Sequence, residues 1–378
     1  MVTTPISGQC DAAFHAVGAA FAGNFVERGE VGAAVTVIVD GRTVVDLVGG
    51  WANPDTERPW THDTLVNFYS VGKALIALLV LQLVDTGRIG LDDPIASVWP
   101  EFGVGGKQGA TVRHALCHRA GVPAIRERLT NDDLWNWQRM TAALAATEAW
   151  WVPGTRHAYH TNTYGHLLGE ILRRTTGDMP GMRLRAVADP LDADLWWAVP
   201  EPDLRRCADI IWAPDREMTD VDFANLSGEP LMIALGYFNP PGYSSKGVVN
   251  TTEWRRAQVP STNGHGTATG LARLYAALLE PGLLLSLSLL AEATRSQSEG
   301  YCPVLGEDTI FGLGFKPTSP RRPFGPNSRS FGHFGTGGAV GFADPDAGVA
   351  FGYVMNQVIP RWQSTRNRAL IDAVYDSL

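Results

Sequence analysis

Two segments at the start of the chain have the apolar spacing of a helix and of a hairpin. Residues 11–28 carry apolar side chains at helical intervals, at Ala13, Val17, Phe21 and Phe25. This spacing predicts an amphipathic helix. The next segment, VGAAVTVIVDGRTVVDLVGGWA, alternates apolar and polar residues on both sides of Asp40-Gly41, a dipeptide typical of tight β-hairpin turns. The chain therefore begins with a helix followed by two antiparallel strands.

Periodicity further along the chain predicts four more helices and three more strands. Helical spacing is found in residues 70–84, 162–176, 266–279 and 364–375. Strand patterns are found in residues 310–315, 330–335 and 349–354. Gly, Pro and short polar clusters break residues 88–130 into loops and short helices. Residues 180–262 lack sustained periodicity and are expected to be irregular with short helices.

This distribution predicts an α/β fold of the α+β kind, with strands and helices at both ends and a mostly helical middle. A sheet domain is expected from residues 1–95 together with 260–378, and an inserted, mostly helical domain from residues 96–259. A chain of 378 residues is long enough for two such domains.

Composition excludes several classes of protein. Hydrophobic residues make up 45% and charged residues 19%, which is ordinary for a globular soluble protein and excludes wholesale disorder. The net charge of −8 arises without long runs of either sign, which argues against a nucleic-acid partner, because phosphate binding needs a concentrated basic face.

The sequence pattern predicts neither a membrane span nor a secretory signal. The run from Ala74 to Val84 has 11 residues and is too short to span a membrane. No Lys or Arg precedes the mildly apolar N-terminal stretch, which Asp11 and His15 interrupt, so no secretory signal is expected. The scattered Cys10, Cys117, Cys207 and Cys302 predict reduced thiols in a cytoplasmic protein.

The stretch NFYSVGKALIALL, residues 67–79, places Ser70 and Lys73 at the start of the apolar run. Residues three apart share a helix face, so both side chains would point toward whatever the helix N-terminus faces. The unpaired N–H groups of that terminus would stabilise an anion forming at the serine. A buried lysine beside a serine can act as its base. A capping serine beside an ordinary lysine is the alternative.

Two further segments carry candidate chemistry. Tyr159 lies before the helix predicted from residue 162, where a tyrosine beside a lysine could relay a proton; an aromatic anchor is the alternative. In FGHFGTGG, residues 331–338, Gly335 would allow close approach of a substrate, and the Thr336 N–H could face an oxyanion. His333 could be a pocket donor or a histidine of the strand.

Other motifs fail or have simpler explanations. Phe68 stands where a GxSxG elbow needs glycine, and no phosphate or dinucleotide loop is found. His114 and His118 have the spacing of a metal pair but no acidic partner, so no metal or cofactor is expected. His157 and His160 are expected to shape the pocket around Tyr159, and His265 to lie in a loop near it.

In chain order, S-x-x-K, a tyrosine box and a late strand motif ending in glycine resemble the serine β-lactamase and penicillin-binding-protein superfamily. The likeness is strongest to class C β-lactamase-like proteins and family VIII carboxylesterases. It covers roughly residues 30–360 and includes the phrases LDDPIASVWPEF, TVRHALCHRAGVP, YGHLLGEILRRTTG, NGHGTATGLARLYAALL and GFADPDAGVAFGYVMN. The resemblance implies an antiparallel sheet flanked by helices, with the active site between the two domains.

The resemblance also implies roles for individual residues. Ser70 would be the acylated nucleophile, Lys73 its proton acceptor, and Tyr159 the group that passes the proton to the leaving group and activates water. The oxyanion hole would consist of the backbone N–H groups of Ser70 and Thr336. His333, Phe334, Gly335 and Asn162 would contact the substrate, with Thr161 in the slot that relatives often fill with Asn.

The late motif departs from the K-T-G of β-lactamases, because this chain has His333-Phe334-Gly335. The change removes the hydroxyl and leaves only a pH-dependent cation, which favours uncharged esters over β-lactams. We therefore expect a serine carboxylesterase that hydrolyses short-chain acyl esters through an acyl-enzyme, as a monomer or homo-oligomer with no nucleic-acid or membrane partner. Alternatives are an amidase, a D-aminopeptidase, a weak β-lactamase or an acyltransferase with the same site, or an idle ligand-binding relative. Five tryptophans are candidate pocket residues: Trp135, Trp137, Trp150, Trp196 and Trp212.

Overall fold

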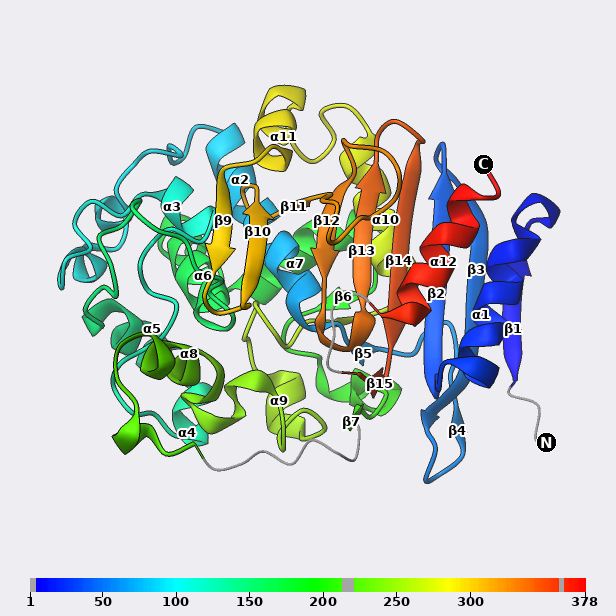
Figure 1. Cartoon of the computed structure of the whole chain (residues 1–378), viewed down its shortest axis with the longest axis horizontal. Helices are drawn as coiled ribbons and strands as arrows, with labels where there is room; N and C mark the ends of the chain where they lie inside the picture. The colour runs from blue at the N-terminus through cyan, green and yellow to red at the C-terminus, as the bar shows by residue number, and fades with distance from the viewer. Residues whose placement is uncertain (1–4, 213–220, 360–363) are drawn as a thin grey trace.

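The structure, a computed structural model, describes residues 5–212, 221–359 and 364–378. A large antiparallel sheet occupies the right half of the view in Figure 1. Its strand order is β1-β3-β2-β14-β13-β12-β11, with β4 paired to β3. The strands are β1 (Ile6–Cys10), β2 (Gly32–Val39), β3 (Arg42–Asn53), β4 (Arg58–Pro59), β11 (Lys316–Pro317), β12 (Phe331–Phe334), β13 (Val340–Asp344) and β14 (Val349–Met355). The predicted antiparallel sheet is confirmed, and its strands come from both ends of the chain.

The β2–β3 hairpin forms where the sequence predicts it. Asp40 and Gly41 have φ values of 48° and 75°, and this left-handed backbone at both central positions is the reason Asp-Gly suits such turns. β14 pairs with β2 along its whole length, from Val349↔Val39 to Met355↔Ala33. This pairing joins the C-terminal half of the sheet to the N-terminal hairpin.

Twelve helices are present in the described part of the chain. They are α1 (His15–Glu27), α2 (Gly72–Asp85), α3 (Val112–Leu116), α4 (Asn131–Leu134), α5 (Trp137–Ala146), α6 (Thr163–Thr176), α7 (Pro180–Ala188), α8 (Gly228–Phe238), α9 (Thr252–Arg256), α10 (Ala268–Leu279), α11 (Leu287–Thr294) and α12 (Thr365–Tyr375). In Figure 1, α1 and α12 lie side by side in front of the sheet and α10 lies behind it. The helices between residues 112 and 256 lie mostly to the left of the sheet.

Short strands complete the architecture. β5 (Val66–Asn67), β8 (His265–Gly266) and β6 (Leu195–Trp196) form a three-stranded sheet, β7 (Ile211–Trp212) pairs with β15 (Gln357–Val358), and β9 (Ser298–Cys302) pairs with β10 (Glu307–Phe311). The predicted domain boundaries are not tested by this arrangement and stay a prediction, and residues 213–220 of the predicted insertion lie outside the described residues.

One expectation about local structure is wrong. Residues 310–315 do not form one strand: β10 ends at Phe311, a turn follows, and β11 begins at Lys316. Gly312 and Gly314 explain the break, because a Cβ at either position would collide with neighbouring atoms of the chain. The stretch after residue 180, expected to be irregular with short helices, contains α8, a helix of 11 residues.

α2 is the element that positions the candidate site. It is apolar on all sides because it is enclosed, with contacts to α6, α7 and β12. No helix in the described ranges is both long enough and apolar enough to cross a bilayer. The four cysteines are free thiols, and the cytoplasmic location stays a prediction.

Candidate active site

The nucleophile candidate, Ser70, lies at the entrance to α2, inside the 3-10 turn η2 (Tyr69–Val71). The residue before it, Tyr69, is buried and has φ 53°, a left-handed conformation that costs an L-residue about 1–3 kcal/mol. Such strain persists only where the surrounding fold enforces it. Ser70 is therefore held at a sharp turn, and its own side chain is 4% exposed.

Lys73 lies one turn further along α2 and faces the same way as Ser70. Its Nζ is 3.1 Å from Ser70 Oγ, and it donates to the backbone carbonyls of Thr161 at 2.6 Å and Ser261 at 2.9 Å. A neutral amine has two N–H groups and one lone pair. With both N–H groups directed at the carbonyls, the lone pair of a neutral Lys73 would face the Ser70 hydroxyl.

The protonation state of Lys73 follows from its surroundings. The side chain is completely buried, and desolvation followed by the charge of Lys316 holds its pKa well below the ordinary lysine value. A lysine in this state is biased toward the neutral amine, the form that accepts a proton, whereas an exposed lysine is held in the charged form.

Tyr159 completes the cluster that the sequence predicts. It is 1% exposed, and Lys73 Nζ lies 4.8 Å from the centre of its ring. Burial raises the pKa of Tyr159 well above its ordinary value, and a hydrogen bond with Ser70 acts in the opposite direction. The phenol is thus the neutral, protonated form at rest, adjacent to both Ser70 and Lys73.

His118 holds the segment that carries Tyr159 through two hydrogen bonds to its backbone. The sequence indicated no such role for this histidine. Its carbonyl accepts from the Ala158 N–H at 3.2 Å, and its Nδ1 accepts from the His160 N–H at 3.2 Å. The imidazole packs 4.9 Å from the Tyr159 ring. The backbone of His118 has φ 63°, so this residue is itself strained. His118 and His160 are 42 residues apart in the sequence. No local motif indicates that they are in contact.

The two histidines with the spacing of a metal pair, His114 and His118, have separate roles. His114 Nδ1 accepts from the Thr111 N–H at the start of α3, while the His118 ring lies against Tyr159. Among the described residues, no cluster of three or more His, Cys, Asp or Glu side chains could hold a metal ion.

The end of β12 lies beside the turn that carries Ser70. A Cβ on Gly335 would collide with the carbonyl of Phe68, so glycine is required for this close approach. Thr336 follows at the start of the 3-10 turn η9 (Thr336–Gly338). The backbone expected to form the oxyanion hole is thus brought next to the nucleophile.

His333 and Phe334 face opposite sides of β12, as the alternation of a strand requires. The His333 ring stacks on Tyr159 with 6.3 Å between centres, and its Nδ1–H donates to the Phe334 carbonyl at 2.7 Å. Burial, then the charges of Lys316 and Lys73, lower the pKa of His333 far below its ordinary value. Phe334 instead stacks on Phe324 at 4.5 Å in the core. Its side chain is therefore directed away from the site where a substrate contact was expected.

Asn162 points away from Ser70, whereas Thr161 contacts Lys73 through its backbone. The Asn162 side chain is buried and its Nδ2 donates to the Gly236 carbonyl at 2.9 Å, toward α8 and not toward Ser70. Thr161 supplies the carbonyl that binds Lys73. The contact is made by the backbone, so the identity of the side chain at 161 does not determine it.

Of the five candidate tryptophans, two lie near the cluster. Trp212 packs edge-on against Tyr69 at 6.3 Å, and Trp150 is packed against the apolar cluster that contains Tyr159 and Phe311. The other three are engaged elsewhere: Trp135 with Trp254, Trp137 with Glu170, and Trp196 with Asp194.

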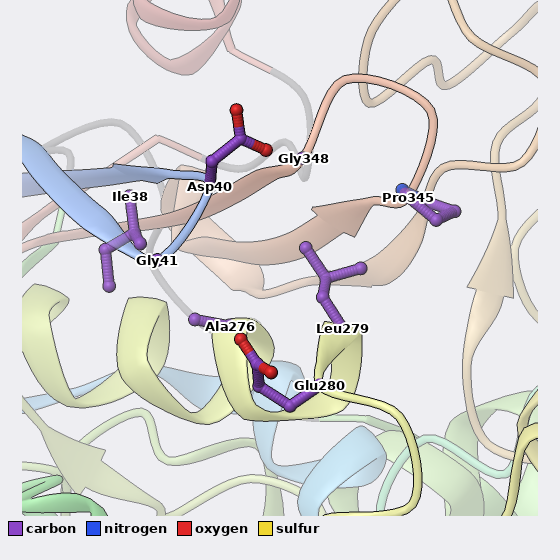
Figure 2. Close-up of a pocket in the computed structure, with 8 residues that line it drawn as sticks. All are labelled: Ile38, Asp40, Gly41, Ala276, Leu279, Glu280, Pro345 and Gly348. Carbon is purple, nitrogen blue, oxygen red and sulfur yellow. The ribbon is translucent and has the colours of Figure 1, made fainter.

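A cavity of about 250 Å³, lined by none of the residues of the Ser70 cluster, lies between the β2–β3 turn, the end of α10 and the β13–β14 turn. Figure 2 shows its lining residues, which include the carboxylates of Asp40 and Glu280 but no serine, cysteine, lysine or histidine. Because this cavity offers neither a nucleophile nor a lysine or histidine base, we take the Ser70 cluster as the candidate active site.

Comparison with known proteins identifies the family of the chain. The family model described as "Beta-lactamase" matches residues 16–376. The esterase/beta-lactamase LipL of Mycobacterium tuberculosis is 33% identical over 94% of this chain and 83% of its own length. The crystal structure of a family VIII carboxylesterase superposes with a TM-score of 0.90 at 35% identity, covering 99% of this chain and 100% of that one. A penicillin-binding-protein homologue from Caulobacter crescentus gives a TM-score of 0.89 at 37% identity, again with 99% and 100% coverage. The resemblance seen in the sequence is confirmed: the chain belongs to the beta-lactamase family.

Proposed function

We propose that the protein is a serine carboxylesterase that hydrolyses short-chain acyl esters through an acyl-enzyme on Ser70. The observation that carries this proposal is the 3.1 Å contact between Ser70 Oγ and the fully buried Nζ of Lys73. The family assignment supports a serine hydrolase of the beta-lactamase fold, and relatives named as esterases support the ester-cleaving type.

The first half of the reaction uses the three clustered side chains. Neutral Lys73 accepts the proton of Ser70 as Oγ attacks the ester carbonyl. The negative charge on the carbonyl oxygen is stabilised by the N–H groups of Ser70 and Thr336, where one such donor is worth about 10²–10³ in rate. Collapse of the tetrahedral intermediate breaks the bond to the alkoxy group, and Tyr159 delivers the proton to the leaving alcohol while Lys73 returns one to Tyr159.

The second half repeats the chemistry with water. A water molecule that replaces the alcohol gives up its proton to the Tyr159–Lys73 pair and attacks the acyl carbonyl. The second tetrahedral intermediate expels Ser70 Oγ, which regains its proton. The products are the carboxylic acid and the resting enzyme.

The late motif, His333-Phe334-Gly335, favours an uncharged substrate. His333 is neutral and its Nδ1–H is engaged with the Phe334 carbonyl, so it offers no cation to a substrate carboxylate. Phe334 provides no hydroxyl and faces the core. β-Lactam hydrolysis is the second candidate function, favoured by a relative that carries both activities in its name.

A panel of substrates tests the proposal. Wild-type protein and Ser70→Ala are incubated with 4-nitrophenyl acetate, 4-nitrophenyl butyrate, nitrocefin and a D-Ala-D-Ala peptide. We expect Ser70-dependent turnover of the two esters, with much lower kcat/KM on nitrocefin and the peptide. Nitrocefin turnover equal to that of the esters would establish the second candidate. Ester turnover that survives Ser70→Ala would refute the mechanism.

A further inference from the structure

A second buried lysine lies beside the site, at a position that neither the motifs nor the mechanism above uses. Lys316 begins β11, pairs with Gly332 of β12, and is 5% exposed. The turn before it crosses α2 closely, because a Cβ on Gly314 would collide with Ala77. Ala77 lies one turn beyond Lys73 on the same face of α2. The fold therefore brings Lys316 to the face of α2 that carries the catalytic pair.

Two stacked rings connect the lysines. Tyr159 and Phe311 are nearly parallel, with an interplanar angle of 12° and 5.9 Å between their centres. Lys73 Nζ lies 4.8 Å from the centre of the Tyr159 ring, and Lys316 Nζ lies 4.3 Å from the centre of the Phe311 ring. Each ring of the pair thus has one lysine over a face. Two ammonium groups in the same dry environment disfavour each other's charge.

Other titratable groups face the two lysines from every neighbouring element. Around Lys73 they are Ser70, Tyr159, His160, His118 and His333. Around Lys316 they are Arg322, Glu307, Cys302, His157, His118 and His333. Burial keeps these histidines uncharged, and Glu307 forms ion pairs with both Arg321 and Arg322. Lys316 is therefore the cation that acts most strongly on Lys73.

We propose that Lys316 is a positioning residue for acyl transfer, whose positive charge, across the Tyr159–Phe311 ring pair, biases Lys73 toward the neutral amine that accepts the Ser70 proton. The proposal rests on the proposed function and adds to it the group that prepares the base. Burial, then Arg322, lowers the pKa of Lys316 to about 7. Lys316 is thus charged at the acidic pH values at which Lys73 would otherwise take up a proton.

The use of lysine in this chain agrees with the proposal. Only four of the 31 basic residues are lysines, at positions 73, 107, 246 and 316, and three of these, Lys73, Lys107 and Lys316, are buried. Lysine can lose its proton inside a protein, whereas arginine cannot. Lysine, and not arginine, occupies both places beside the Tyr159–Phe311 pair.

The small number of lysines makes a direct test possible. Protein labelled with [¹³Cε]lysine gives four side-chain NMR signals, assigned by single substitution, and the pH titration of Lys73 is followed in wild-type, Lys316→Met, Lys316→Arg and Lys107→Met proteins. The acid limb of kcat/KM for 4-nitrophenyl butyrate is measured on the same samples. In Lys316→Met, the Lys73 titration and the acid limb should both move to higher pH by on the order of 0.5–1 unit. Lys316→Arg keeps the charge and should leave both at or below the wild-type position, and Lys107→Met should change neither.

Three results would overturn the proposal. One is a Lys73 titration that does not move in Lys316→Met, and another is an equal shift in Lys316→Met and Lys316→Arg. The third is an increase in the KM of Lys316→Met that is confined to an anionic ester such as mono-4-nitrophenyl glutarate. This result would make Lys316 a substrate-binding group. The NMR titration needs no turnover, so a protein without Ser70-dependent esterase activity would refute the proposed function while still deciding whether Lys316 acts on Lys73.

Discussion

The Nζ of Lys73 and the Oγ of Ser70 lie 3.1 Å apart, one helical turn from each other, and both side chains are buried. The backbone carbonyls of Thr161 and Ser261 bind the same Nζ from the other side. A serine and lysine at this spacing occur in many chains. What distinguishes this pair is that three separate segments enclose the amine and leave it facing the hydroxyl.

Replacing Lys73 with Met should remove the general base while preserving the volume of the side chain. Proton transfer by a positioned base contributes about 10²–10⁴ in rate, so kcat for 4-nitrophenyl butyrate should fall by at least about 10². The matched control is Lys107→Met, which removes another buried lysine, one that binds the Val104 and Thr147 carbonyls. Equal losses of kcat in the two variants would show that burial, and not base catalysis, explains the effect.

Replacing Tyr159 with Phe should lower kcat by about 10² or more with little change in KM, because only the proton relay is lost. Tyr164→Phe is the control within the same segment. The Tyr164 hydroxyl donates to the Leu116 carbonyl at 2.9 Å, and its loss should cost about 1–3 kcal/mol of stability without lowering kcat. Steady-state kinetics and thermal unfolding separate the two outcomes. A Tyr159→Phe enzyme of normal kcat would remove Tyr159 from the mechanism.

His118 should matter through position and not through its proton. His118→Ala loses the acceptor for the His160 N–H and lets the Tyr159 segment shift, which can cost up to about 10²-fold in kcat. Asn keeps an acceptor and tolerates the left-handed backbone, so His118→Asn should recover most of the activity. Burial gives His118 a pKa far below its ordinary value, so the pH profile of the Asn variant should match wild type. Equal activity of the Ala and Asn variants would argue against this role.

A buried ion pair near the C-terminus should affect stability only. Arg366 Nη1 lies 3.1 Å from Glu30 Oε1, with exposures of 2% and 0%, and Tyr353 donates to the same carboxylate. Arg366→Met leaves that carboxylate buried without its charge partner and should cost about 3–5 kcal/mol. The double variant Glu30→Leu/Arg366→Met should recover part of this loss, as measured by guanidinium chloride unfolding. Additive losses in the double variant would contradict a coupled pair, and kcat should stay normal throughout.

The sequence predicts the features that depend on residues close together in the chain, such as turns, helix ends and motifs of fixed spacing. The hairpin at Asp40-Gly41 follows from turn chemistry. The end of α6 at Thr176 follows from apolar spacing and from Gly177, the left-handed residue after it, with φ 86°. Ser70, Lys73 and Tyr159 belong to motifs with fixed spacing. Alternation along β12 places His333 and Phe334 on opposite faces, whereas the resemblance to the K-T-G motif implies a substrate contact for both.

The remaining features depend on contacts between distant segments. His118 reaches Tyr159 through the loop after α3, and Lys316 reaches the site because two glycines break the expected strand and turn the chain across α2. No periodicity or motif indicates such contacts. β1 was missed for another reason: its residues, ISGQC, are largely exposed and alternate weakly, since only one neighbouring strand pairs with it.

The central claim is an acyl-enzyme formed on Ser70 by this cluster, and trapping that intermediate tests it most directly. Wild-type protein, Ser70→Ala and Tyr159→Phe are mixed with excess 4-nitrophenyl butyrate, quenched in acid within milliseconds to seconds, and analysed by intact and peptide mass spectrometry. We predict a butyryl adduct on the peptide containing Ser70 in the wild type, accompanied by a burst of 4-nitrophenol, with slower formation in Tyr159→Phe and none in Ser70→Ala. An adduct on another residue, or turnover by the wild type with no adduct at any quench time and no burst, would contradict the account.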